Sequence, residues 1–136
     1  DQGAFETIVL ARTPNRYLAG IIEVALKSIY SDKTNWRSML KNTLDDSIDL
    51  VEEKWSSCEL LPADLQEYYS EEENISQFLY PVSQYPEKVS SLSLDKTALL
   101  GGLLTGIKGQ YLIFDHQFVF NVRRHTSYEI NLKINE

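Results

Sequence analysis

Three charged residues near the start of the chain have the spacing to share one flank of a helix. Arg16, Glu23 and Lys27 follow one another at steps of seven and four residues, which bring side chains close together on a helical surface. If Glu23 faces a groove, its carboxylate would coordinate Mg²⁺ or Mn²⁺, and the metal would polarise a phosphodiester. The alternative is a surface Glu–Lys pair worth about 0.2–0.5 kcal/mol. The sequence leaves both interpretations open.

A second set of basic and aromatic residues gathers near the end of the chain. Lys108 and the pair Arg123 and Arg124 lie at the ends of neighbouring predicted strands. With the aromatic residues around them they could grip a phosphate backbone and stack a base. The alternative is a structural role, in which Arg–Glu and Tyr–His contacts among these residues stabilise the last strand crossing of a small barrel. The candidates for binding DNA or RNA are Arg16, Lys108, Tyr111, Arg123, Arg124, His125 and Tyr128.

No complete catalytic centre can be assembled from the sequence. Cys58 lies in a helical pattern without a nearby His to generate the thiolate. The glycines around Lys108 are not followed by the Ser or Thr and the helix of a phosphate-binding loop. One Cys and two His are too few for a structural zinc site, which needs four ligands. We therefore predict no nuclease activity for this chain alone, and whether it is an enzyme at all stays open.

The net charge of −7 is concentrated in the middle of the chain. Residues 42–95 carry two Lys or Arg against thirteen Asp or Glu, whereas residues 1–41 carry six against four and residues 96–136 five against three. The molecule as a whole therefore lacks the positive electrostatic field that attracts nucleic acid, although residues 1–41 and 96–136 are mildly basic. The acidic middle is either a solvated face or a surface that meets a basic protein partner.

Composition predicts a cytoplasmic protein. The lone Cys58 cannot form an internal disulfide, so nothing indicates an oxidising compartment. The longest apolar run, residues 98–104, is much shorter than the roughly 20 residues of a membrane-spanning helix, so no membrane partner is predicted. The chain begins at Asp1 without Met, and we expect further residues upstream.

The first part of the chain predicts one strand followed by helices. Residues 5–11 are apolar and β-branched, which is typical of a buried strand. A helix follows to about residue 30, with Thr13 as N-cap and Leu18, Ile21, Ile22, Ala25 and Ile29 as its buried stripe. Ser31 and Asp32 are expected to cap a second helix. A third is expected over residues 46–58, with Ile48, Val51 and Trp55 on its apolar side. Residues 63–73 predict a short helix and an acidic loop.

From residue 75 onward the pattern changes to short strands separated by turns. The predicted strands are residues 75–82, 89–94, 99–107, 110–115, 118–122 and 128–134. They favour an antiparallel sheet or a small barrel. The predicted fold class is thus α+β, with residues 1–74 as a strand and helical region and residues 75–136 as a β-rich unit.

Several motifs make the sequence resemble a known bacterial family. They are DQGA (1–4), RTPNR (12–16), GIIEVALK (20–27), DKTNWRSML (32–40), YPV (80–82), LDKT (94–97), GIKGQYLIFD (106–115) and NVRRHTSYE (121–129). The chain resembles the C-terminal portion of domain-of-unknown-function family 2797, with Ser127 where Gly is expected. The resemblance implies longer relatives with a Cys-rich, zinc-binding N-terminal region.

A more distant resemblance links residues 5–27 to the GIY-YIG endonuclease fold. It implies that residues 5–11 match the third strand of that fold and that Glu23 matches its metal-binding Glu. The tyrosines and the Arg of that fold would lie upstream of Asp1. The leading hypothesis is therefore a nucleic-acid-associated protein built on a GIY-YIG-like remnant. The alternative is a non-catalytic scaffold or protein-interaction domain that uses its acidic helical surface.

Overall fold

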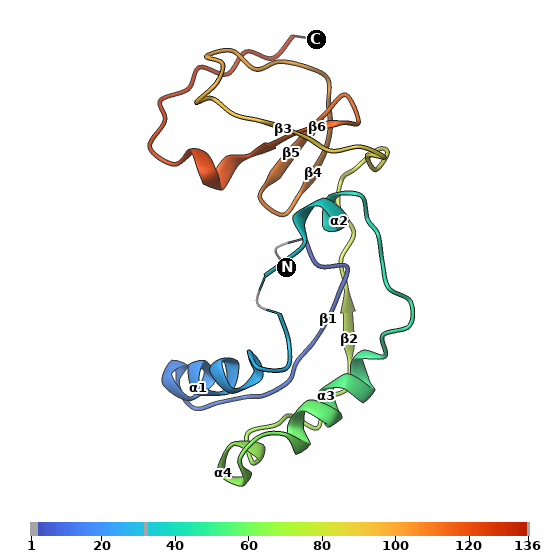
Figure 1. The fold of residues 1–136 in the computed structure, drawn as a ribbon, viewed down its shortest axis with the longest axis vertical. Coiled ribbons are helices and arrows are strands. Elements are labelled where there is room, and N and C mark those ends of the chain that lie inside the picture. Colours follow the sequence, from blue (N-terminus) through green and yellow to red (C-terminus); the bar gives the residue numbers. More distant parts are fainter. Residues whose placement is uncertain (1–2, 32, 136) are drawn as a thin grey trace. The chain divides into compact units, whose positions relative to one another are not determined.

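The computed structural model describes residues 3–31 and 33–135, which form two units (Figure 1). Unit 1 comprises residues 3–79 and unit 2 begins at residue 80. Unit 1 holds a strand, helices and a second strand, and unit 2 holds a four-stranded sheet, which confirms the predicted α+β class. Within the described ranges, no helix combines the length and the apolar character needed to cross a bilayer.

A long antiparallel pairing joins the two ends of unit 1. Strand β1 (Glu6–Ile8) pairs with β2 (Ile75–Gln77), with Thr7 opposite Ser76. Beyond β1, in a different register, Ala11 forms an isolated antiparallel bridge with Tyr69. The buried strand predicted over residues 5–11 is therefore present only in part, as β1 and the single bridge at Ala11, and none of its residues is fully buried. Its partner is the strand that follows the predicted boundary near residue 74.

Helix α1 (Arg16–Leu26) begins two residues later than predicted, because Asn15 and not Thr13 is the N-cap. The Asn15 side chain accepts a hydrogen bond from the Leu18 amide at 3.0 Å, and Asn ranks above Thr at this position. The helix buries Ile22 and Leu26 against Leu61 and Leu65, whereas the predicted stripe residue Ile29 is 41% exposed.

Helices α2 (Trp36–Leu40) and α3 (Leu50–Glu59) also begin later than predicted. Asn35 caps α2 in place of Ser31 and Asp32, of which Asp32 lies outside the described residues. Asp49 caps α3 by accepting from two backbone amides. In each case an Asx side chain directly before the helix satisfies amides that a more distant residue cannot reach.

Helix α3 packs through polar groups instead of the predicted apolar side. Lys54 and Ser57 are buried, whereas Ile48, before the helix, is 54% exposed. The Lys54 ammonium donates to the Glu72 carbonyl at 2.6 Å, and the Ser57 hydroxyl bonds that of Tyr69 at 2.7 Å. The short helix α4 (Ala63–Gln66) follows as predicted.

Unit 2 is an open mixed sheet with the order β3-β6-β5-β4. Its strands are β3 (Ser90–Leu92), β4 (Leu104–Lys108), β5 (Tyr111–Phe114) and β6 (Phe118–Asn121), followed by the 3-10 helix η1 (Val122–His125). The β4–β5 and β5–β6 pairs are antiparallel, as predicted for the hairpin of residues 110–122.

Two features of unit 2 correct the sequence-based expectation. Strand β3 pairs parallel to β6, so the sheet is not purely antiparallel and does not close into a barrel. The described residues of the last predicted strand, 128–134, form no strand, and Ile130, Leu132 and Ile134 are each at least 65% exposed. β-Branched residues alone do not make a strand when no neighbouring edge pairs with them.

Candidate functional site

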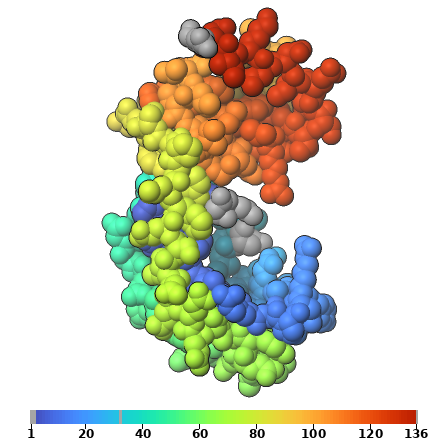
Figure 2. Space-filling model, turned by 180° about the vertical axis from the view of Figure 1, so that it is seen from behind, coloured from blue at the N-terminus to red at the C-terminus, as the bar shows by residue number. Residues whose placement is uncertain are grey.

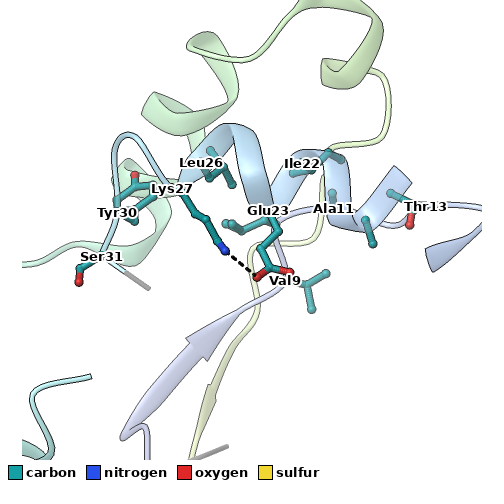
Figure 3. Close-up of a pocket in the computed structure, with 11 residues that line it drawn as sticks. Val9, Ala11, Thr13, Ile22, Glu23, Leu26, Lys27, Tyr30 and Ser31 are labelled. Carbon is teal, nitrogen blue, oxygen red and sulfur yellow. Dashed lines mark ion pairs between the residues drawn. The ribbon is translucent and has the colours of Figure 1, made fainter. Parts of the chain in front are cut away.

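Unit 1 contains an apolar groove between the segment after β1 and helix α1 (Figure 3). Its volume is about 660 Å³, within the range of ligand-binding clefts. Its lining residues are Val9, Leu10, Ala11, Thr13, Ala19, Ile22, Glu23, Leu26, Lys27, Tyr30 and Ser31. Most of these side chains are aliphatic, so the groove favours an apolar occupant. We call it the α1 groove.

The walls of the α1 groove are held in place by contacts on the far side of the strand. The Arg12 amide donates to the Tyr68 carbonyl, and the Ser70 amide donates to the Leu10 carbonyl, both at 2.9 Å. The Arg12 guanidinium also pairs with the Glu72 carboxylate at 2.6 Å. That ion pair and its hydrogen bond lower the pKa of Glu72. The strand wall is thereby fixed along one edge only.

Glu23 lies on the rim of the groove and pairs with Lys27 (Figure 3). The Lys27 ammonium lies 4.0 Å from the Glu23 carboxylate, and their side chains are 45% and 73% exposed. The predicted groove position and the predicted i,i+4 pair therefore occur together. Arg16 is the first residue of α1 and does not line the groove.

The residues around Glu23 offer few ligands for a divalent metal ion. Among the described residues, no group of three His, Cys, Asp or Glu is close enough to hold a metal ion. Glu23 is the one carboxylate among the described residues that line the groove, and the charge of Lys27 offsets it. Mg²⁺ binds through several oxygen ligands, so the residues present do not form such a site on their own.

Part of the acidic middle is structural. Glu53 accepts from the Tyr30 hydroxyl at 2.9 Å, and Glu73 accepts from the Trp55 indole at 2.6 Å. Burial, followed by the bond to Glu53, raises the pKa of Tyr30. The segment after α4, coloured yellow-green, runs along the surface of unit 1 (Figure 2). Other carboxylates, including Glu52 and Glu59 of α3, are exposed.

Lys108 is buried in unit 2 and does not present its charge at the surface. Its side chain is 1% exposed, and its ammonium lies 5.2 Å from the ring centre of Tyr80 and 4.8 Å from that of Tyr85. Burial lowers the pKa of Lys108. The aromatic faces partly replace the hydration that the ammonium loses. In this conformation Lys108 cannot contact a phosphate.

His125 is also a structural residue of unit 2. Its ring stacks on Phe120 with centroids 4.5 Å apart, and it is 8% exposed. Nε2 accepts from the Leu94 amide at 3.2 Å, so Nδ1 carries the proton and donates to the Asn121 carbonyl at 2.8 Å. Both ring nitrogens are therefore engaged in fixing η1.

Arg123 and Arg124 remain at the surface of unit 2, on the short helix η1. Arg123 and Tyr111 both line a hollow of about 280 Å³, although Tyr111 is only 8% exposed. Tyr128 is 45% exposed, and its hydroxyl donates to Asp95, which raises the pKa of Tyr128. The nucleic-acid candidates thus divide between exposed residues (Arg16, Arg123, Arg124 and Tyr128) and buried ones (Lys108, Tyr111 and His125).

Sequence reasoning identified Glu23 and Lys27 but missed the other residues of the α1 groove. Val9 and Ala11 were assigned to a buried strand, and Ala19 was not singled out. The only available signal was the two-residue alternation of the strand, which does not show whether a neighbouring strand is present. Residue types alone therefore could not indicate an open groove.

Comparison with known proteins supplies a family. No curated protein and no solved structure matches the chain. One family model, described as "Protein of unknown function (DUF2797)", matches residues 1–130. Because that match covers almost the whole sequence, the chain belongs to the DUF2797 family of proteins of unknown function.

Proposed function

We propose that unit 1 is a protein-binding module that takes a basic partner. The observation that carries this proposal is the α1 groove, an apolar cleft open to solvent in a strongly acidic unit. Residues 3–79 carry seven Lys or Arg against fourteen Asp or Glu. Apolar contact supplies binding energy, and opposite charge steers the partner and selects it.

The acidic helix α3 is linked to one end of the groove. Tyr30 lines the groove and donates to Glu53 in the first turn of α3. Glu52 is next to it, and Glu59 lies on the same side of the helix, seven residues on. A partner that enters the groove with basic residues at its ends would meet these carboxylates.

Charge reversal on α3 tests this proposal. The probe is a fluorescent ten-residue peptide, the basic strand peptide, with two lysines at each end and alternating valine and threonine between them. We expect Glu52→Lys/Glu59→Lys to weaken binding about five- to tenfold at low salt. The matched control, Glu87→Lys/Glu129→Lys, makes the same net charge change in unit 2. Equal weakening by both variants, or no binding by the wild-type chain, would overturn the proposal.

A second candidate is association with nucleic acid through unit 2, and one specific observation favours it. Arg123 and Arg124 are exposed side by side on a turn fixed by the Asn121 cap, and Arg123 borders the smaller hollow. Guanidinium groups bind phosphates, and an apolar hollow beside them could take a base. The net charge of −7 opposes this binding.

The second candidate has its own test, a single-stranded DNA or RNA oligonucleotide titrated at low and moderate salt. Arg123→Ala/Arg124→Ala should weaken binding and reduce the salt slope by roughly one for each Arg removed. Absence of binding at low salt would end this candidate.

The GIY-YIG-like remnant, with Mg²⁺ or Mn²⁺ at Glu23, belongs to the same second candidate. Mn²⁺ binding that is unchanged in Glu23→Gln would end the metal prediction. A cytoplasmic location and the lack of nuclease activity in this chain stay predictions.

A further inference from the structure

The strand that forms one wall of the α1 groove has an unpaired edge. The Phe78 amide donates to the Phe5 carbonyl at 2.9 Å, so residues 5 and 7 bond to β2. Because bonding alternates along an antiparallel strand, the backbone groups of Glu6 and Ile8 point away from β2. Among residues 3–31 and 33–135, this sheet of unit 1 consists of β1 and β2, so that edge of β1 has no neighbouring strand in the described part of the chain.

A backbone position that faces away from the paired side recurs at Ala11, after the register of the pairing has changed. Arg12 and Leu10 bond to residues 68 and 70, so the amide and carbonyl of Ala11 point to the opposite side. Within the described ranges, Ala11 takes part in no backbone–backbone hydrogen bond. An unpaired row of donors and acceptors is a template for another extended chain.

The unpaired edge of β1 leads into the apolar groove, and the two features meet at Ala11. Val9 and Ala11 line the α1 groove together with Ala19 and Glu23 of α1, and Glu23 extends toward Val9 (Figure 3). Val9, directly after β1, is 37% exposed although it is an apolar, β-branched residue. A two-stranded ribbon is at best marginally stable, and a third strand adds both hydrogen bonds and apolar burial. An extended segment is therefore the occupant that satisfies both features at once.

We infer that unit 1 binds an extended peptide segment of a partner protein as an added strand along Glu6 to Ala11. The backbone of that segment bonds the free edge, and alternate apolar side chains enter the α1 groove. Lys or Arg residues flank its apolar core, because unit 1 carries twice as many acidic as basic residues. This inference rests on the proposed protein-binding function and names the form that the partner takes.

Backbone pairing makes a prediction that charge attraction does not make. The basic strand peptide is compared with a copy whose central amides are N-methylated, which keeps every side chain and removes the backbone donors. We expect the methylated copy to bind at least tenfold more weakly. On binding of the unmodified peptide, amide exchange at Ile8 and Ala11 should slow at least tenfold. Exchange at Arg12, which already bonds Tyr68, should change little.

Each outcome of this experiment decides the inference. Equal binding of both peptides would overturn strand addition and leave the protein-binding function standing, because that function is tested by charge reversal on α3. Binding without slower exchange at Ile8 and Ala11 would also overturn it. So would self-association of the free chain that slows exchange at these amides, since a second copy would then be the occupant.

Discussion

At the scale of single residues, the sequence predicts pairs on one helix better than contacts across the fold. The spacing of Glu23 and Lys27 predicted their ion pair, because a helix fixes the distance between such positions. Burial of Lys108 could not be predicted in this way. It depends on Tyr80 and Tyr85, which lie more than twenty residues earlier in the chain and reach the ammonium only in the folded unit.

Ser127 provides a residue-scale prediction. Its φ of 71° lies in the left-handed region, which favours glycine, and Gly is the residue expected there from the family motif. We expect Ser127→Gly to stabilise unit 2 by a net amount of about 0.5 kcal/mol, since relief of strain exceeds the added entropy of the unfolded chain. Urea unfolding followed by circular dichroism measures this change.

The matched control at this position is Ser127→Ala, which keeps a Cβ and so keeps the strain. This variant should not stabilise the protein. A lower unfolding midpoint for Ser127→Gly than for the wild-type chain would show that the Ser side chain contributes more than its backbone conformation costs.

At the scale of elements, the local sequence pattern predicted the helices and the β5–β6 hairpin. It did not predict the N-cap residues or the pairing of strands that are distant in the sequence. The β5–β6 hairpin was predicted because its turn is local, and Asp115 and His116 both adopt the positive φ of a tight hairpin turn. The parallel pairing of β3 with β6 joins segments about thirty residues apart, and no local signal encodes it. The N-caps of α1, α2 and α3 are Asn15, Asn35 and Asp49, because each of these residues lies directly before its helix.

The acidic loop between α4 and β2 yields a pH prediction. The hydrogen bond and the ion pair with Arg12 lower the folded-state pKa of Glu72 below its unfolded-state value. Ionised Glu72 therefore contributes fully to the stability of the folded state above its unfolded-state pKa of about 4.3. This contribution is lost as the pH falls through the folded-state pKa. Glu72→Gln should thus lower stability at pH 7 and flatten its dependence on pH below about pH 4.5.

Tryptophan fluorescence reports this prediction specifically, because Trp36 and Trp55 both lie in unit 1. Urea unfolding at pH 7 and pH 3.5 gives the two stabilities to compare. Glu71→Gln is the control, since it removes an adjacent exposed carboxylate. If Glu71→Gln and Glu72→Gln change the pH dependence equally, the Arg12 pair is not its cause.

At the scale of the whole molecule, the acidic charge belongs to one unit. Residues 80–136 carry six Lys or Arg against five Asp or Glu, whereas unit 1 carries the excess of acids. The sequence predicted this uneven distribution, because charge can be counted without a fold. The α1 groove could not be predicted in this way, because it exists only where residues 9–13, after β1, lie against α1 in the folded chain.

The central claim is that a partner binds in the α1 groove, and one affinity measurement tests it most directly. Ala19→Gln places a longer side chain on the groove wall, whereas Val24→Gln places the same side chain on a part of α1 that is 66% exposed and does not line the groove. Both variants keep good helix formers on α1. The account predicts that Ala19→Gln weakens binding of the basic strand peptide at least fivefold and that Val24→Gln leaves it within twofold of the wild-type value. Equal affinities for the two variants would contradict it.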